Sequence, residues 1–279
     1  MREIKDPKEM YLYSRKAKSH GKKVGLVPTM GALHEGHLSL VEEARKRADT
    51  VVVSIFVNPI QFGPSEDLAR YPRNLGSDKK LLRHFDVDVL FMPEARTVYP
   101  EGFKTFVEVE GLSKKLCGRS RPTHFRGVTT VVAKLFNMVC PDIAFFGGKD
   151  YQQQIIIKRM AKDLDFPVEI VALPTVREFD GLAMSSRNAY LTQKERRSAL
   201  ILYRSLCLAK EEIGKGEKDP RKILFRIRSA VGTEPSVRLD YVAMVDPETL
   251  EEVRKIKGKV LVALAAYLGK TRLIDNMMI

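Results

Sequence analysis

Apolar and polar positions alternate along this chain in two different ways. In the first part, short continuous apolar runs separate stretches in which apolar residues recur every three or four positions. A continuous run predicts a strand that is buried on both faces, and the longer period predicts an amphipathic helix. The strongest run is Thr-Val-Val-Val-Ser-Ile-Phe-Val, residues 50–57, which is rich in β-branched side chains.

Strands and helices are therefore expected in turn, and this order is typical of a parallel sheet with helices on both faces. We predict a Rossmann-like α/β domain over residues 1–175. The expected strands are residues 24–28, 50–57, 87–92, 143–146 and 168–172. The expected helices are residues 37–47, 78–85, 128–139 and 151–164.

The last part of the chain has a different order, because helices come first and strands then follow one another directly. A long helix is expected over residues 193–214, and it opens with a capping box formed by Thr192 and Glu195. Pro220 favours the start of a second helix. The strands expected after it are residues 237–245, 259–268 and 271–274. We predict a smaller C-terminal α+β domain, residues 176–279, that acts as a lid.

The segment Pro-Thr-Met-Gly-Ala-Leu-His-Glu-Gly-His, residues 28–37, joins an expected strand to an expected helix. Ligands of open parallel sheets bind at the carboxyl ends of strands, and a helix N-terminus attracts phosphate. His34 and His37 are three residues apart, so their rings can share one face and stabilise charge on a phosphate. Two alternatives stay open. The histidines cap or pack the helix, or they form a metal pair, for which no third ligand is evident nearby.

Two further loops follow expected strands and carry polar side chains. Asn58 and Gln61 stand in Asn-Pro-Ile-Gln, where their amides suit hydroxyl or carboxylate groups, although Asn-Pro is also a common turn. Lys149 stands in Gly-Gly-Lys-Asp, residues 147–150, where a compact cation suits phosphate. The Walker A spacing is absent, and an ordinary turn with a surface lysine is the alternative. Gln153 lies one turn further on and can face the same crevice.

A loop expected over residues 175–191 contains Met-Ser-Ser-Arg, residues 184–187. Two hydroxyls and a guanidinium can bind several phosphate oxygens, so we predict a mobile phosphate clamp, with a solvated linker as the alternative. The basic segment over residues 119–126 either steers anions or is simply solvated. Scattered carboxylates are candidate contacts for Mg²⁺: Asp67, Asp78 and Asp142.

Composition narrows the classes of protein that remain. The 279 residues include 48 Lys and Arg against 35 Asp and Glu, so the net charge is +13. The basic residues are spread along the chain, which favours a solvated surface with a polyanion pocket over a nucleic-acid-binding module. Apolar runs are shorter than the ~20 residues of a membrane span, and the first residues are charged, so we expect a cytoplasmic protein without a membrane partner. Three scattered cysteines without Cys-x-x-Cys argue against a disulfide framework and a cysteine zinc site.

Four segments together resemble the pantoate–β-alanine ligase (pantothenate synthetase) family over residues 22–191. They are Pro-Thr-Met-Gly-Ala-Leu-His-Glu-Gly-His, Val-Ser-Ile-Phe-Val-Asn-Pro-Ile-Gln-Phe, Arg-Pro-Thr-His-Phe-Arg-Gly-Val and Leu-Ala-Met-Ser-Ser-Arg-Asn. The family belongs to the cytidylyltransferase-like superfamily, whose His-x-Gly-His pattern is met here. The resemblance implies that ATP, (R)-pantoate and β-alanine give pantothenate, AMP and pyrophosphate through a pantoyl-adenylate. It also implies a homodimer, and Mg²⁺ held mainly by the ATP phosphates.

The resemblance further implies roles for individual residues, with His37 as a proton donor and Val176 against adenine. The catalytic set is His34, His37, Lys149, Ser185, Ser186 and Arg187. The ATP-binding set is Met30, Gly31, His34, His37, Gly147, Gly148, Lys149, Asp150, Val176, Met184, Ser185, Ser186 and Arg187. The set for pantoate and β-alanine is Asn58, Gln61 and Gln153. Where Gly148 stands the family usually has Glu or Gln, and Cys117 replaces a Glu whose role cannot be carried over.

Two rival functions predict different features. A nucleotidyltransferase of the same superfamily would keep the nucleotide in its product, whereas a ligase releases AMP. The amides of Asn58, Gln61 and Gln153 suit an uncharged polyol acid better than a phosphorylated acceptor. An RNA-binding module would need exposed aromatic residues interleaved with basic ones, and the sequence does not show that pattern.

Overall fold

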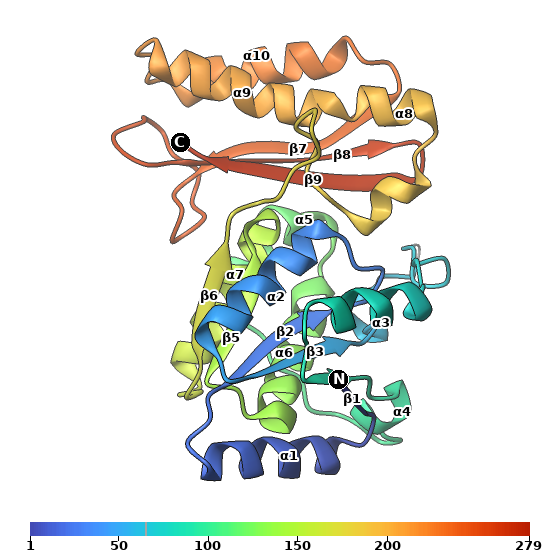
Figure 1. Cartoon of the computed structure of the whole chain (residues 1–279). Coiled ribbons are helices and arrows are strands. Elements are labelled where there is room, and N and C mark those ends of the chain that lie inside the picture. The colour runs from blue at the N-terminus through green and yellow to red at the C-terminus, as the bar shows by residue number, and fades with distance from the viewer. Residues whose placement is uncertain (65) are drawn as a thin grey trace. The chain divides into compact units, whose positions relative to one another are not determined.

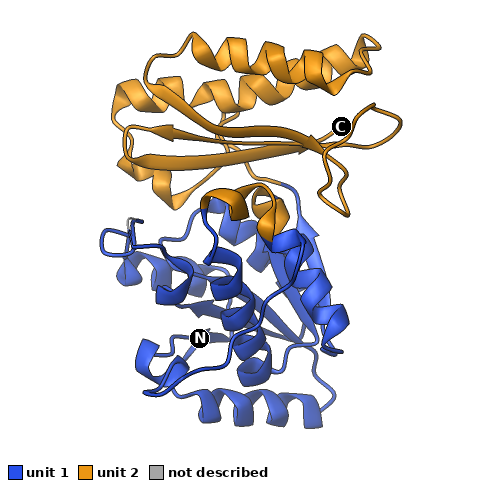
Figure 2. Cartoon of the chain, turned by 180° about the vertical axis from the view of Figure 1, so that it is seen from behind, with its two compact units in different colours: residues 1–113, 121–148, 153–174 blue, residues 114–120, 149–152, 175–279 orange. Residues whose placement is uncertain are grey.

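The computed structural model of this chain describes residues 1–64 and 66–279, which form two compact units (Figure 2). Unit 1 comprises Met1–Ser113, Arg121–Gly148 and Gln153–Pro174. Unit 2 comprises Lys114–Ser120, Lys149–Gln152 and Thr175–Ile279. The two short segments 114–120 and 149–152 thus belong to unit 2, and no pattern in the sequence predicted this assignment. The assignment of substrate binding to residues 1–175 and of a lid to residues 176–279 stays a prediction.

Unit 1 is built on a sheet of six parallel strands in the order β1-β4-β3-β2-β5-β6 (Figure 1). The strands are β1 (Arg2–Ile4), β2 (Val24–Thr29), β3 (Thr50–Ile55), β4 (Val89–Phe91), β5 (Ile143–Gly147) and β6 (Glu169–Leu173). The central strands read as continuous apolar runs because helices cover both faces of the sheet. The predicted parallel α/β fold is confirmed.

Right-handed crossovers between these strands put α2 and α3 on one face and α1, α6 and α7 on the other. The helices are α1 (Pro7–Ser19), α2 (Glu35–Arg47), α3 (Leu75–His84), α4 (Ala95–Val98), α5 (Cys117–Ser120), α6 (His124–Val139) and α7 (Tyr151–Asp163). Packed against β2, β3 and β5, α2 encloses a core of buried aliphatic side chains and Phe145. This packing holds the carboxyl ends of the central strands in a fixed arrangement.

Neither α1 nor β1 was predicted from the sequence, and α6 begins earlier than predicted. Only Met10 and Ser14 of α1 are buried, so its apolar stripe is too thin to show as a period. Asp6 caps the helix and Pro7 opens it, and these two residues were the available signal. The start of α6 was hidden because its first residue, His124, lies in the basic segment.

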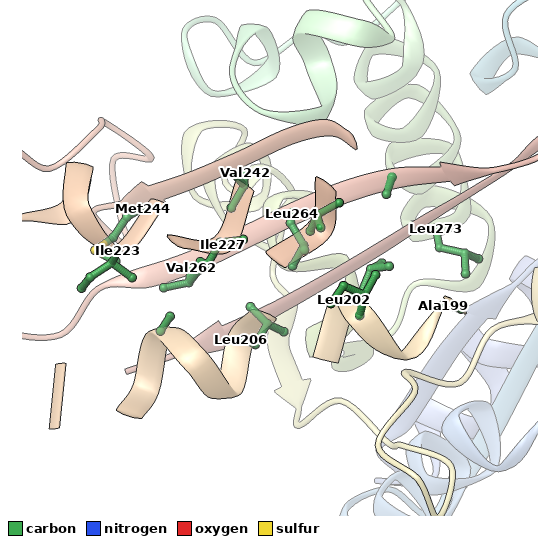
Figure 3. Close-up of a cluster of buried hydrophobic side chains, with 14 of the residues drawn as sticks. Ala199, Leu202, Leu206, Ile223, Ile227, Val242, Met244, Val262, Leu264 and Leu273 are labelled. Carbon is green, nitrogen blue, oxygen red and sulfur yellow. The ribbon is translucent and has the colours of Figure 1, made fainter. Parts of the chain in front are cut away.

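Unit 2 contains an antiparallel sheet, β7-β8-β9, with helices packed on it. Its strands are β7 (Val237–Val245), β8 (Leu261–Leu268) and β9 (Thr271–Met278). Its helices are α8 (Gln193–Ser198), α9 (Leu200–Gly214) and α10 (Pro220–Gly232). Figure 3 shows the core between these layers, where Leu202 and Leu206 of α9 and Ile223 and Ile227 of α10 meet the sheet. The predicted small α+β arrangement is confirmed.

Two details of unit 2 differ from the prediction. The helix expected over residues 193–214 is broken, because the N–H of Leu202 donates to the carbonyl of Ala199 three residues back, which tightens the turn. Ser198, at the break, is held by hydrogen bonds with Glu234 and Ser236. β9 also continues to Met278 rather than ending at residue 274. Among the described residues, no helix has both the length and the apolar character needed to cross a membrane.

Candidate active site

Three loops that carry predicted site residues leave the same edge of the sheet in unit 1. They follow β2, β3 and β5, and β2 lies between the other two. The chain moves from β2 to β3 in one direction and later returns to β5 on the opposite side of β2. Such a reversal opens a crevice at the carboxyl ends of parallel strands, where ligands of open α/β sheets bind.

The loop after β2 is held by a buried carboxylate. Gly31 and Ala32 have φ values of +80° and +51°, and the N–H groups of Ala32 and Leu33 donate to the carboxylate of Asp78 on α3 at 3.0 and 2.8 Å. Gly31 is required here, since a Cβ would lie 3.1 Å from an Asp78 oxygen in a left-handed conformation. Asp78 is only 2% exposed, so it organises the loop.

The carboxylates of Asp78 and Asp142, which were candidate contacts for Mg²⁺, are both engaged by protein groups. Asp142 lies at the start of β5, where its carboxylate accepts the N–H of Val24 at 2.8 Å and pairs with Lys18 at 2.8 Å. That end of the strand is opposite to the carboxyl edge. Among the described residues, no three His, Cys, Asp or Glu side chains are arranged to hold a metal ion. For Asp67 the proposed Mg²⁺ contact stays a prediction.

His34 and His37 lie together at the N-terminus of α2, with ring centroids 4.1 Å apart. Nδ1 of His34 accepts the N–H of Gly36 at 3.2 Å, and Nδ1 of His37 accepts the N–H of His34 at 3.4 Å. Both rings thus take part in a capping box, which is the structural alternative considered above. Capping and catalysis are compatible here, because a neutral ring that accepts at Nδ1 carries its proton on Nε2 and can donate it.

Gln61 is buried next to the loop after β2 and is held through its side chain. Its Oε1 accepts from Nδ2 of Asn58 at 2.9 Å, and its Nε2 lies 3.2 Å from Sδ of Met30. Asn58 is 1% exposed, and its amide also bonds to the carbonyl of Gly127 at 3.1 Å and to the hydroxyl of Tyr99 at 2.8 Å. Asn58 is thus fully engaged by protein groups, whereas among the described residues Gln61 Nε2 faces only a weak sulfur acceptor.

The backbone of Gln61 is fixed as well. Its carbonyl lies 2.9 Å from Nδ1 of His124 and accepts from Arg121 at 3.4 Å. Gly127 lets α6 approach this turn, because a Cβ there would lie 2.6 Å from the Gln61 Cα. Arg121 also forms two 2.6 Å hydrogen bonds with Glu66. The basic segment therefore supports Gln61, a role that the sequence analysis did not foresee.

Lys149 belongs to unit 2, where the last strand holds its backbone. The side-chain amide of Asn276 on β9 donates to the Lys149 carbonyl at 2.7 Å. Burial lowers the pKa of the Lys149 ammonium; Asp150 and Asp275 act in the opposite direction, and Arg187 lowers it further. A half-buried cation with a lowered pKa gains stability from a new anion beside it, so a phosphate group suits this position.

A buried ion pair ties the loop after β6 to the same strand. The guanidinium of Arg177 makes two hydrogen bonds, of 2.6 and 3.0 Å, to the carboxylate of Asp275. Its Cζ lies 4.6 Å from the ring centroid of Tyr203, and it donates to the carbonyl of Gly181 at 3.0 Å. Burial raises the pKa of Asp275, and the hydrogen bond and charge of Arg177 oppose that rise. No local pattern indicates this pair, because its members are 98 residues apart.

The Met-Ser-Ser-Arg segment follows directly in this ordered loop. The N–H of Met184 donates to the carbonyl of Val176 at 3.0 Å, and Ser185 caps the 3₁₀ turn at Ser186–Tyr190 by accepting the N–H of Arg187 at 3.3 Å. In the same loop, the amide of Asn188 donates to Glu178 at 2.7 Å. The segment therefore has a defined conformation within unit 2.

The structure divides the predicted site residues between the two units. In unit 1, it brings Met30 together with Gln61, and His34 together with His37. Gln153 lies on α7 and is half-buried. The members in unit 1 are Met30, Gly31, His34, His37, Asn58, Gln61, Gly147, Gly148 and Gln153. The members in unit 2 are Lys149, Asp150, Val176, Met184, Ser185, Ser186 and Arg187.

Residues 2–278 match the family described as pantoate-beta-alanine ligase. A relative named pantothenate synthetase from Moorella thermoacetica is 55% identical over 267 residues, which cover 96% of this chain and 94% of that protein. A relative of the same name from Acetivibrio thermocellus is 55% identical over 279 residues, which cover 100% of this chain and 99% of that protein. The similarity thus extends over essentially the whole chain.

Solved structures show the same relation. The crystal structure of pantothenate synthetase from Thermus thermophilus has a TM-score of 0.94 at 47% identity and covers 99% of each chain. The structure of pantoate-beta-alanine ligase from Francisella tularensis, complexed with beta-gamma ATP and beta-alanine, has a TM-score of 0.81 at 36% identity and covers 100% of this chain and 97% of that chain. The chain belongs to the pantoate–β-alanine ligase family.

Proposed function

We propose that this protein condenses (R)-pantoate with β-alanine to give pantothenate, at the expense of ATP, which leaves as AMP and pyrophosphate. One observation carries the proposal. In a member of this family, the loops after β2, β3 and β5 bring polar residues to the carboxyl ends of the central strands, where the strand order reverses. A carboxylate acylates amines poorly, so pantoate first attacks the α-phosphorus of ATP and displaces pyrophosphate. The amine of β-alanine then attacks the carbonyl of the pantoyl-adenylate, and AMP leaves. The protein contributes positioning and charge stabilisation.

The residues of unit 1 suit the first half of this reaction. The paired rings of His34 and His37 at the start of α2 offer Nε2 donors to a phosphate, beside a helix end that attracts anions. Gln61 Nε2 offers a donor to an oxygen of pantoate, and Asn58 holds it in that orientation. Gln153 adds a second amide for pantoate. Met30 and Gly31, in the loop after β2, line the ATP site. Gly147 and Gly148 line the ATP phosphates.

The residues of unit 2 suit charge neutralisation on ATP. Lys149 and Arg187 are cations that act on one another, so an anion beside them relieves their mutual repulsion. Ser185 and Ser186 add hydroxyl donors. Val176 and Met184 lie against the adenine, and Asp150 is next to Lys149 in the chain. Mg²⁺ would be held mainly by the ATP phosphates, because carboxylates that could have bound it are engaged elsewhere. A homodimer in the cytoplasm completes the proposal.

The test is ATP–pyrophosphate isotope exchange with pantoate present and β-alanine absent. The expected result is exchange that depends on pantoate, because adenylate formation is reversible. Pantoate labelled with ¹⁸O in its carboxylate should also transfer one labelled oxygen to AMP once β-alanine is added. A nucleotidyltransferase would give neither result and would keep the nucleotide in its product. Absence of both exchange and AMP release would exclude the ligase activity.

A further inference from the structure

The amide of Gln61 can present either its NH₂ group or its carbonyl to a ligand, and its neighbours decide which. Oε1 faces Asn58 Nδ2 at 2.9 Å, so Nε2 lies on the other side, toward Met30. Asn58 is oriented in the same way. Its Oδ1 accepts from the hydroxyl of Tyr99 at 2.8 Å, and its Nδ2 also donates to the carbonyl of Gly127 at 3.1 Å.

We propose that Tyr99 is a positioning residue for the pantoate pocket. Its hydroxyl and the carbonyl of Gly127 together hold the amide of Asn58, which in turn orients Gln61, so that Nε2 is presented as a donor to an acceptor oxygen of the substrate. The inference rests on the proposed function, because it takes pantoate as the ligand of Gln61. Tyr99 itself lies outside the sets of site residues predicted from the sequence. The pocket would thus select an oxygen-rich acid over a ligand that offers only donors.

Tyr99 is held firmly enough to serve as the origin of this chain of hydrogen bonds. It caps the C-terminus of α4, where its N–H donates to the carbonyl of Ala95 at 2.7 Å. Its ring packs against Phe56 and, edge-on, against Phe103, at centroid distances of 6.2 and 5.1 Å. Burial raises the pKa of the Tyr99 phenol, which therefore keeps its proton at neutral pH and remains a donor.

Loss of this donor would remove one of the three hydrogen bonds that position the amide of Asn58. Asn58 is 1% exposed, so its Oδ1 would be buried without a partner once the hydroxyl is removed. Asn58 would then be held only by its two donor bonds, to the carbonyl of Gly127 and to Oε1 of Gln61. A shift of Asn58 toward another donor for its Oδ1 would lengthen the bond to Gln61 and leave Nε2 less well oriented toward the substrate.

The experiment compares Tyr99→Phe with the wild-type protein in the ATP–pyrophosphate exchange assay. The pantoate KM should rise about 5- to 30-fold, which is the effect of losing an oriented hydrogen bond, while the ATP KM stays within about twofold. Tyr13→Phe removes another half-buried hydroxyl, on α1, and should leave both constants unchanged. A pantoate KM for Tyr99→Phe within twofold of wild type would overturn the proposal.

A double-mutant cycle separates orientation from general packing. If Tyr99 acts through Gln61, then Tyr99→Phe should have no further effect on the pantoate KM in a Gln61→Ala background. Effects that multiply in the double variant would overturn the proposal. Asn58→Asp is the second test, because the aspartate still accepts from Tyr99 but cannot donate to Gln61, and it should raise the pantoate KM at least as much. Failure of the proposed function is a separate result, since the wild-type protein itself would then show no exchange.

Discussion

The two units hold their candidate substrate residues at different points. In unit 1, Gln61 is held at both its side chain and its backbone, because Asn58 and Met30 contact its amide and His124 contacts its carbonyl. In unit 2, Lys149 is held through its backbone by Asn276, a residue on a strand at the far end of the chain. The difference teaches that a candidate residue can be oriented from within the motifs, as Gln61 is, or by a residue that no motif contains, as Lys149 is by Asn276.

The largest effect should come from breaking the ion pair that supports the arrangement in unit 2. Arg177→Met leaves the carboxylate of Asp275, which is 2% exposed, without its guanidinium. The free energy of unfolding should fall by about 3–5 kcal/mol, because an uncompensated charge then stays buried. Urea denaturation measures it. Arg221→Met removes the cation of an exposed pair with Asp219 and should leave stability unchanged; equal losses in both variants would contradict the reasoning.

Removal of the Lys149 ammonium tests whether this candidate residue of unit 2 takes part in the reaction. Lys149→Ala should slow pantoate-dependent ATP–pyrophosphate exchange by about 10²-fold or more, the usual effect of losing a charge contact in a transition state. Lys158→Ala removes an exposed ammonium from the same helix region, on α7, and should exchange at the wild-type rate. Unchanged turnover in Lys149→Ala would remove this residue from the mechanism.

A glycine substitution probes how closely α6 must approach Gln61. In Gly127→Ala the new methyl group would lie 2.5 Å from the Ile60 carbonyl oxygen and 2.6 Å from the Gln61 Cα, so the backbone must shift. We expect a loss of about 1–3 kcal/mol in the free energy of unfolding, as for other overpacked sites, together with a raised pantoate KM. Gly214→Ala, with no atom within 4 Å of the new Cβ, should be neutral or stabilising. The idea fails if both variants behave alike.

The smallest effect concerns the pH dependence of the support behind Gln61. Burial raises the pKa of Glu66, but the hydrogen bond and charge of Arg121 outweigh it and hold that pKa below the ordinary 4.5. A carboxyl with a lowered folded-state pKa stabilises the fold above its unfolded pKa and loses this contribution as the pH falls through the folded value. Glu66→Gln should therefore flatten the decline of stability below pH 4.5. Urea titrations between about pH 3 and 7 would show parallel curves if the pair contributes nothing.

Much of the fold followed from the sequence because it depends on local pattern. The β-branched run at residues 50–57 predicted a buried strand, and β3 covers Thr50–Ile55 of it; Thr192 with Glu195 formed the expected capping box. The pattern failed where burial was slight, as in α1, or where a tight turn broke a continuous helix at Ala199.

The candidate site was predictable only in part for the same reason. The loops around His34 and Lys149 follow strands, so local order and topology pointed to them. Tyr99 and Asp275 gave no such signal, because their partners lie 41 and 98 residues away, and only the folded chain brings them together. The roles of the predicted site residues in binding and catalysis stay predictions until the variants above are measured.

The hydrogen bond between Asn276 and the Lys149 carbonyl also has a consequence for folding during translation. The two residues are separated by 127 positions, so a ribosome that has just added Lys149 must still translate most of unit 2. At about 5–20 residues per second, that takes roughly 6–25 seconds. During this interval the nascent chain can complete the parallel sheet, but the backbone of Lys149 still lacks its bond to Asn276. A messenger cut short before codon 276 would therefore yield a chain that never secures this lysine.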